Sequence, residues 1–336
     1  MSLLSVRNLS VTYPASYGDV PAVRGASFDV NEGEVVGLAG ESGCGKSTIA
    51  SALLRLLPKG TRVSGEILLD GEDIMTMSWG RLRAVRWGEA SIIFQGALHG
   101  LDPVKRVGEQ IAEAITIHAP SMTDKQAMTR VGELIDQVGL PARRARDYPH
   151  ELSGGQRQRI MIAMALACDP KIVIADEPTT ALDVMVQAQV LNQMKKLQRD
   201  LGLSMIFITH DLSVLVDVAD RIAVMYAGRV VEQGPADEVF ADPKHPYTRA
   251  LGSAFPEIGD MSYRRAPTGL PGDPPDPTDL PTGCTFHPRC PDVMPECSVS
   301  SPLLTPAGDN RQAACLLIPD CKVEDTEAVD AEAVPT

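Results

Sequence analysis

A glycine-rich turn between an apolar run and a helical segment constrains the fold of this chain more than any other feature. The apolar run covers residues 35–39, the turn has glycines at positions 40, 43 and 45, and Lys46 and Ser47 open the segment that follows. In a strand, turn and helix of this kind, backbone N–H groups and the positive end of the helix dipole point toward a phosphate group. The sequence therefore predicts a P-loop in an α/β fold.

The residues of this turn have separate expected roles. Lys46 is expected to reach the β- and γ-phosphates of a nucleotide, and Ser47 to supply a hydroxyl to Mg²⁺. An aromatic ring near the N-terminus, Tyr13 or Tyr17, could stack on the base, and packing on a sheet edge is the alternative. The expected contacts of nucleotide and Mg²⁺ within the turn are Gly40, Ser42, Gly43, Gly45, Lys46, Ser47 and Thr48.

The composition limits where the protein can be located in the cell and which classes of partner it can bind. The 336-residue chain has a formal net charge of −13, so its overall charge gives no support for binding nucleic acid. It has no window of about 18 uninterrupted apolar residues, and its N-terminus lacks the order of a signal peptide. We therefore expect a cytosolic chain, in which the seven cysteines are ligands or bystanders rather than disulfides.

Two carboxylates follow an apolar run further along the chain. Residues 172–175 read Ile-Val-Ile-Ala, and Asp176 and Glu177 come next. A carboxylate that ends a buried strand beside a P-loop can hold Mg²⁺ through water, which suits Asp176. Glu177 can face the opposite way and act as the general base on the attacking water. A helix N-cap is the alternative for an acidic pair in this place.

Two further polar residues end predicted strands. Gln95 closes the run 90–94, and His210 follows the run 204–209. Strand ends face the ligand in α/β sheets, so both side chains are expected near the phosphates. The alternatives are a solvated strand end for Gln95 and a structural role for His210.

A polar region separates Gln95 from the acidic pair. Residues 107–117 and 123–138 show apolar residues at helical spacing, which predicts a helical insertion in the α/β domain. The insertion ends at a second glycine turn before a predicted helix over 157–167. This arrangement predicts a second anion site, without a lysine, whose residues are Ser153, Gly154, Gly155 and Gln156.

The order of these motifs resembles that of the nucleotide-binding subunits of ABC transporters. The resemblance covers roughly residues 1–255 and is far more specific than any single motif. It implies a P-loop ATPase core with an antiparallel β lobe and a helical signature subdomain. In chain order the motifs are the P-loop, Gln95, the Leu-Ser-Gly-Gly-Gln run, the Asp-Glu pair, an Ala-Leu-Asp run that ends at Asp183, and His210.

The resemblance also implies roles. Gln95 would contact Mg²⁺ and sense the transporter, Asp183 would lie at a dimer seam, His210 would contact the γ-phosphate, and Tyr13 would stack on the base. Residues 153–156 would clamp the ATP held by a partner subunit's P-loop, so an isolated chain is expected to hydrolyse ATP poorly. Catalysis would rest on Glu177, His210 and Gln95.

The partners are implied in the same way. They would be a second, similar ATPase in a heterodimer, two membrane permeases and, indirectly, an extracytoplasmic substrate-binding protein. The chain would be peripheral on the cytoplasmic face of the membrane, and a homodimer is the alternative pairing.

The C-terminal part of the chain resembles one group within this family. Residues 242–251 are similar to a segment in ATPases of the oligopeptide, dipeptide and nickel importer group, and the proline-rich residues 267–281 predict a linker. That group implies a [4Fe–4S] cluster, with Cys321 as a spare ligand. Structural zinc and uncoordinated cysteines are the alternatives, and no pair has the C-x₂-C spacing of a zinc knuckle. The implied cluster ligands are Cys284, Cys290, Cys297 and Cys315.

The expected function is ATP-driven import of di- or oligopeptides. Nickel or oligosaccharide import is the alternative within the class. An ABC ATPase that acts on DNA or ribosomes is the alternative outside this class, and the lack of a basic face is evidence against it.

After Gln95 this chain has Gly96-Ala97 where the family commonly has Asp-Pro, close to the expected permease contact. The expected parts are the core (1–94 and 166–255), the helical subdomain (95–165), the cysteine-rich extension (256–321) and a disordered acidic tail (322–336).

Overall fold

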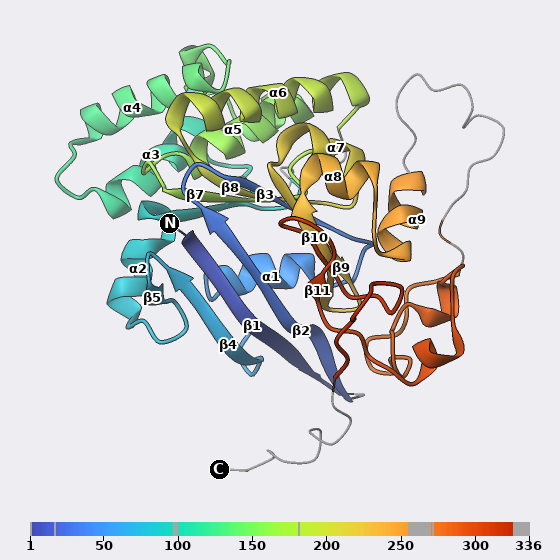
Figure 1. Ribbon diagram of the computed structural model, residues 1–336. Coiled ribbons are helices and arrows are strands. Elements are labelled where there is room, and N and C mark those ends of the chain that lie inside the picture. The colour runs from blue at the N-terminus through green and yellow to red at the C-terminus, as the bar shows by residue number, and fades with distance from the viewer. Residues whose placement is uncertain are drawn as a thin grey trace.

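Two β-sheets and a helical layer make up the computed structural model, which describes residues 2–16, 18–96, 100–180, 182–254, 270 and 272–324. The larger sheet is the middle layer, with α1 (Lys46–Leu53) and the smaller sheet on one face (Figure 1). The other face is covered by α3 (Val107–His118), α4 (Asp124–Gln137), α5 (Gly154–Ala165) and α6 (Val184–Leu201). Its strands, in spatial order, are β11 (Thr305–Pro306), β12 (Gln312–Ala313), β10 (Arg229–Pro235), β9 (Arg221–Tyr226), β3 (Val35–Ala39), β8 (Ser204–Thr209), β7 (Ile172–Asp176) and β6 (Ala90–Ile93).

The strands from β9 to β6 run parallel to one another. Every residue of β3, β7 and β8 is buried, and such uninterrupted apolar runs are typical of parallel strands covered on both faces. Because parallel strands end at the same edge of the sheet, the segments that follow β3, β6, β7 and β8 come together there. The predicted α/β fold is confirmed, and it gathers the predicted site at one edge.

The smaller sheet is antiparallel, as the resemblance to ABC transporter subunits implies for the β lobe. Strand β1 (Ser2–Ala15) pairs with β2 (Gly18–Asn31) on one side and with β4 (Arg62–Leu69) on the other, and β5 (Glu72–Asp73) pairs with β4. The segment around residue 17 connects β1 and β2, although Tyr17 itself lies outside the described residues.

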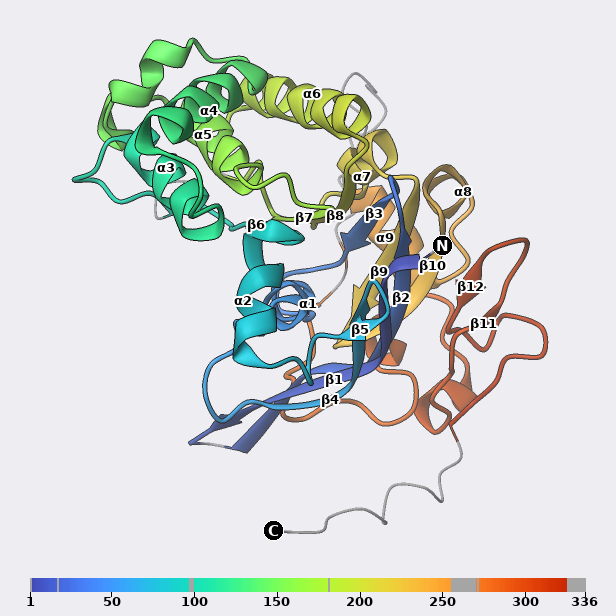
Figure 2. The same ribbon diagram turned by 90° about the vertical axis from the view of Figure 1, so that its left-hand side faces the viewer.

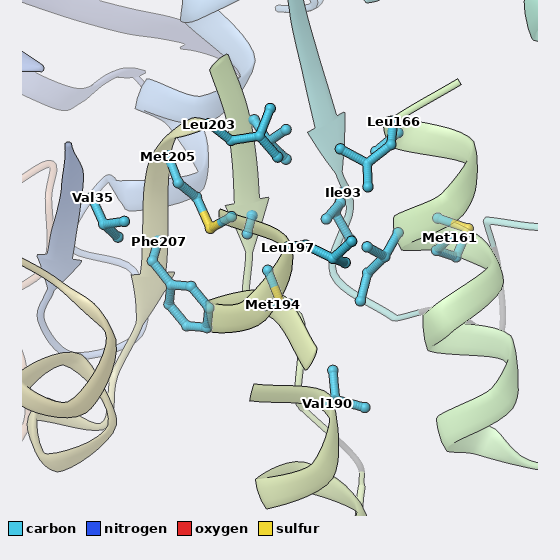
Figure 3. Packing of buried hydrophobic residues seen from close by; sticks show 14 of the residues in the cluster. Val35, Ile93, Met161, Leu166, Val190, Met194, Leu197, Leu203, Met205 and Phe207 are labelled. Atoms are coloured by element: carbon cyan, nitrogen blue, oxygen red, sulfur yellow. The ribbon is translucent and has the colours of Figure 1, made fainter. Parts of the chain in front are cut away.

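Hydrophobic side chains are buried on both faces of the larger sheet. On one face the strands pack against α5 and α6, and Figure 3 shows Ile93, Met205 and Leu197 among the side chains that meet there. On the other face α1 (Lys46–Leu53) lies against the smaller sheet and buries Ile49. The helix that starts at the P-loop is therefore enclosed between two sheets, as Figure 2 shows from a second direction.

The helical insertion is confirmed as α3 and α4, and α4 begins at a Thr123 cap. The helix after the Ser-Gly-Gly turn begins at Gly154 rather than at 157, because the Ser153 hydroxyl accepts from the backbone N–H of Gln156. Within the described residues no helix has the length and apolarity that crossing a bilayer requires. The other α-helices of the described residues are α2 (Trp79–Gly88), α7 (Leu212–Val218), α8 (Ala236–Ala241) and α9 (Pro246–Ala254).

The C-terminal extension joins the larger sheet. Strand β12 pairs antiparallel with β10, and β11 pairs with β12. Lys322 and Glu324, which the sequence assigns to the acidic tail, bond to the extension, since the backbone N–H of Glu324 donates to the carbonyl of Ser301. The rest of the predicted tail, from residue 325, lies outside the described residues. The extension is thus an added edge of the core rather than a separate unit.

Candidate nucleotide-binding site

The P-loop joins β3 to α1 through a turn that requires glycine at two positions. Gly40 and Gly45 have φ angles of 146° and 105°, which side chains rarely allow. A Cβ atom at Gly40 would lie 2.3 Å from the carbonyl oxygen of Met225, and one at Gly45 would lie 2.3 Å from that of Ala22. The turn therefore packs directly against backbone from β2 and β9. Ser42 and Gly43 remain exposed at its outer side.

Lys46 and Ser47 open α1 with their side chains in different surroundings. The Lys46 side chain is buried and donates to the carbonyl oxygens of Gly40 and Glu41 at 2.7 and 2.8 Å. The exposed Ser47 hydroxyl donates to the carboxylate of Asp176 at 3.1 Å. Burial raises the pKa of Asp176, and the Ser47 hydrogen bond opposes that shift. A serine hydroxyl beside a buried carboxylate is a donor set that suits Mg²⁺, which takes few protein ligands besides water and phosphate.

Glu177 is the point on which the other strand-end residues converge. Its carboxylate accepts from the Gln95 side-chain amide at 2.7 Å and from the Thr180 hydroxyl at 2.8 Å. Nδ1 of His210 lies 3.6 Å from the same carboxylate. Three segments distant in sequence thus meet at one acid.

The backbone of Glu177 is strained. Its φ angle is +45°, a left-handed conformation that costs a residue with a side chain roughly 1–2 kcal/mol. Its backbone N–H donates to the carbonyl oxygen of Ile208 on β8, which holds the strained turn in place. The two neighbouring acids have different partners: Asp176 accepts from Ser47, and Glu177 accepts from Gln95 and Thr180.

Tyr13 lies beside the start of α1. Its hydroxyl donates to the Thr48 hydroxyl at 3.2 Å, so β1 brings this ring to the P-loop. The structure thus brings together Tyr13, the P-loop, Gln95, the acidic pair and His210.

The signature motif, which is the Ser-Gly-Gly-Gln run 153–156, is not part of this group of residues. Ser153 caps α5, and its backbone N–H donates to the Gln156 side chain at 3.0 Å. Among the described residues no hydrogen bond joins this motif to the P-loop. A Cβ atom at Gly155 would lie 2.3 Å from Val186, so this glycine lets α5 and α6 approach closely. Asp183 caps α6 by accepting from the backbone N–H of Val186.

Sequence reasoning missed two contributions to the site. Thr180 holds the Glu177 carboxylate, and a threonine three residues after an acid gives no distinctive pattern. Glu41, inside the P-loop, pairs with Arg289 of the extension at 2.7 Å. No local pattern links residues 248 positions apart, so only the Arg289 position next to a cysteine could have drawn attention to it.

The four predicted cluster ligands do not form a ready metal site. In the described part of the chain, no group of three Cys, His, Asp or Glu side chains is arranged to hold a metal ion. All seven cysteines are free thiols. The four are nevertheless neighbours: burial raises the pKa of Cys284, Cys290 and Cys315, for the last to about 11, and Cys297 adds to the shift in all three. Cys321 instead donates to the carbonyl oxygen of Lys322.

A P-loop beside a strand-end acid pair, a glutamine and a histidine, with a capped Ser-Gly-Gly helix on another face, defines an ATPase of the ABC class. Residues 23–180 match the family described as ABC transporter. Residues 231–297 match the family described as oligopeptide/dipeptide transporter, C-terminal region.

Relatives extend the match to almost the whole chain. The putative peptide import ATP-binding protein of Brucella abortus (strain 2308) is 45% identical over 316 residues, which cover 93% of this chain and 94% of the relative. The oligopeptide transport ATP-binding protein OppD of Bacillus subtilis (strain 168) is 44% identical over 336 residues, covering 98% and 93%. The chain belongs to the peptide-import ATP-binding proteins of ABC transporters, and it is an ATPase.

Solved structures agree with this fold. The ATP-binding cassette MJ0796, in a dimeric post-hydrolysis state bound to ADP and Pi, has a TM-score of 0.62 and 29% identity, and it covers 69% of this chain and 98% of its own. CbiO1 from Clostridium perfringens, part of the transporter complex cbiONQ, has a TM-score of 0.61 and 30% identity over 72% of this chain and 91% of its own. Both matches leave about a third of this chain outside the shared cassette.

Proposed function

We propose that this chain hydrolyses ATP to drive the import of di- or oligopeptides through two membrane permeases, from the cytoplasmic face of the membrane. The observation that carries the proposal is the full-length similarity to peptide-import ATP-binding proteins, on a chain whose strand-end residues converge on Glu177. The relatives favour peptides over nickel or oligosaccharides, which the sequence alone leaves open.

The P-loop is the proposed phosphate site. Lys46 would exchange its two backbone carbonyl partners for the β- and γ-phosphates, and the exposed side of the turn would supply N–H groups. Ser47 and Asp176 would hold Mg²⁺, which when bound neutralises charge on the β- and γ-oxygens. Tyr13 would stack on the base from its place beside Thr48.

Glu177 is the proposed general base. Its carboxylate takes a proton from the attacking water while the water oxygen bonds to the γ-phosphorus and the bond to the ADP oxygen breaks. Gln95 and Thr180 fix the carboxylate in place, so less reorganisation is needed when the water arrives. His210, whose Nδ1 lies 3.6 Å from the other carboxylate oxygen of Glu177, would contact the γ-phosphate.

The signature motif is proposed to act on a partner's nucleotide. Ser153 is exposed on the end of α5, where the helix presents its positive dipole end outward. Next to Asp183, the side chains of Val184 and Met185 are 63% and 72% exposed, an apolar pair at the start of α6 that suits a contact between subunits. We propose a second, similar ATPase as this partner, which closes on ATP and opens after hydrolysis.

Uptake by a reconstituted transporter tests the function. Proteoliposomes with this chain and its partner ATPase facing the lumen, and with the binding protein outside, should accumulate a labelled oligopeptide through the permeases when ATP is enclosed in the lumen. The same vesicles with Glu177→Gln should not. Accumulation of nickel or a labelled oligosaccharide in place of the peptide would contradict the proposed substrate class.

The cysteine set is proposed to hold a [4Fe–4S] cluster. Support comes from the nearness of four half-buried or buried thiols, since Cys297 adds to the raised pKa of the other three, and from backbone N–H groups of Phe286 and His287 that stabilise the Cys284 thiolate. No step of the ATPase mechanism depends on this cluster. Protein purified without oxygen should contain about four irons and four acid-labile sulfides per chain, and Cys290→Ser should lower both. One zinc per chain, or no metal, would contradict the cluster.

A further inference from the structure

Glu41 of the P-loop is fixed by groups from three parts of the molecule. Its backbone N–H donates to the Tyr247 hydroxyl on α9 at 2.8 Å, and its carbonyl oxygen accepts from Lys46. Its carboxylate accepts two hydrogen bonds from the Arg289 guanidinium, at 2.7 and 3.0 Å. The residue between Gly40 and Ser42 therefore has little freedom to move.

Arg289 comes from the C-terminal extension and is itself well packed. Its side chain is 6% exposed, and it lies in the one-turn helix His287–Arg289 directly before Cys290. Besides Glu41 it donates to the carbonyl oxygen of Gly272 at 3.1 Å and stacks 5.8 Å from the ring centre of Tyr226. The bond to Glu41 is the first cause of a raised Arg289 pKa, so the guanidinium keeps its charge.

An aromatic cluster supports the pair from behind. The rings of Tyr226 on β9, Tyr247 on α9 and Phe286 of the extension have centres 4.6 to 5.3 Å apart. All three side chains are buried. The position of Arg289 is thus set by the core and the extension together, and the guanidinium fork is held ready for a carboxylate.

We propose that Arg289 is a positioning residue for ATP binding: through its two hydrogen bonds to Glu41, the C-terminal extension holds the P-loop turn in the shape that receives the phosphates. A turn that is already ordered loses less conformational entropy when it binds a ligand, so the pair contributes to ATP affinity without touching ATP. The inference rests on the proposed phosphate site of the P-loop and extends it to a residue that the ATP-binding cassette itself does not contain.

Nucleotide affinity of the full chain tests the proposal. Arg289→Met should weaken binding of a fluorescent ATP analogue about tenfold, and Arg289→Lys, which keeps the charge but loses the fork, by about threefold. In the assembled transporter Arg289→Met should raise the KM for ATP about tenfold and change kcat by less than about threefold, because the lost interaction is not specific to the transition state.

A second buried arginine of the extension provides the matched control. Arg311 has a 6% exposed side chain and donates to Glu232 on β10 at 3.0 Å, away from the P-loop. Arg311→Met removes the same kind of ion pair from the same extension. At a temperature where thermal melts show both variants folded, it should leave ATP affinity within about twofold of wild type. Equal losses of affinity in the two variants would reduce Arg289 to a structural residue.

A double variant isolates the Glu41 contact. If the pair is what positions the turn, Glu41→Gln together with Arg289→Met should weaken ATP binding no further than Arg289→Met does alone. Fully additive losses, or wild-type affinity in Arg289→Met, would overturn the proposal. Lys46→Ala separates this failure from failure of the phosphate site, since unchanged affinity in Lys46→Ala would refute the site itself.

Discussion

The P-loop and the signature motif are both glycine-containing turns at the start of a helix, but the chain surrounds them differently. The P-loop turn is enclosed by backbone of β2 and β9, contacts α9 and the extension, and has Asp176 beside it. The signature motif bonds mainly within itself, and Ser153 is exposed. The P-loop half of the proposed nucleotide site is thus built within the chain, whereas the signature motif is open to the partner proposed above.

The largest expected effect lies in the half that the chain completes. Glu177→Gln should lower the ATPase turnover of the assembled transporter about 10³-fold while ATP affinity stays within a few-fold, because it removes the general base and keeps the shape of the side chain. Turnover and nucleotide binding measured on the same preparation check this. Wild-type turnover in the variant would remove Glu177 as the base.

Lys46→Ala should show that this half binds ATP without a partner. The variant loses a charged donor to the phosphates, so we expect the isolated chain to bind a fluorescent ATP analogue about 30-fold more weakly. Lys171→Ala is the control, because that exposed lysine pairs with Asp70 far from the turn. Similar losses in both variants would mean that the effect is not local to the P-loop.

Acid should destabilise the part of the chain at the start of α9, where the Tyr247 hydroxyl contacts the P-loop. Burial lowers the pKa of His245 to about 4, from 6.5, and its Nδ1 accepts from the backbone N–H of Tyr247. A lowered folded-state pKa means that the stabilising contribution is present above pH 6.5 and is lost as the pH falls toward 4. Between pH 7.5 and pH 5 this group should therefore cost about 2 kcal/mol of unfolding free energy.

Chemical unfolding at the two pH values measures this loss. In His245→Gln the fall in stability between pH 7.5 and pH 5 should be smaller than in wild type by about that amount. His118→Gln, at the half-buried end of α3, is the control. An unchanged pH dependence in His245→Gln would show that another group is responsible.

The smallest expected effect on the ATPase rate comes from a substitution in the signature motif. Ser153→Ala should leave ATP affinity of the isolated chain unchanged and lower the ATPase rate of the assembled transporter about fivefold, along with about 1 kcal/mol of stability from the lost cap. Thr123→Ala removes the equivalent cap of α4 and controls for that loss of stability. A weaker ATP affinity in isolated Ser153→Ala would break the comparison, because the motif would then serve its own chain.

The sequence predicts most of the P-loop half for a physical reason. Parallel strands of buried residues end at one edge, so polar residues that close such runs meet there, and Gln95, Glu177 and His210 do. Helix starts were less accurate: α5 begins three residues early, because a serine cap and glycines extend the helix into the motif. Thr180 was missed because its bond to Glu177 follows from a local turn rather than from a periodic pattern.

Contacts of the extension lie beyond prediction from the sequence. Strands β11 and β12 have two residues each, too short for any alternation of burial to appear. The Glu41–Arg289 pair joins two segments whose local sequences give no sign of each other. Such long-range pairs arise when a chain folds back on its own core, and local propensity contains no information about them.

The pairing of β12 with β10 has a consequence for the protein in the cell. Without the extension, β10 would be the edge of the larger sheet, and Glu232 and Gln233 would offer unpaired backbone groups where they now pair with Ala313 and Gln312. An open edge of that kind is a template for strands of other chains. A shortened chain that stops after α9 would thus be prone to aggregate, and the pairing of β12 covers the edge that would cause it.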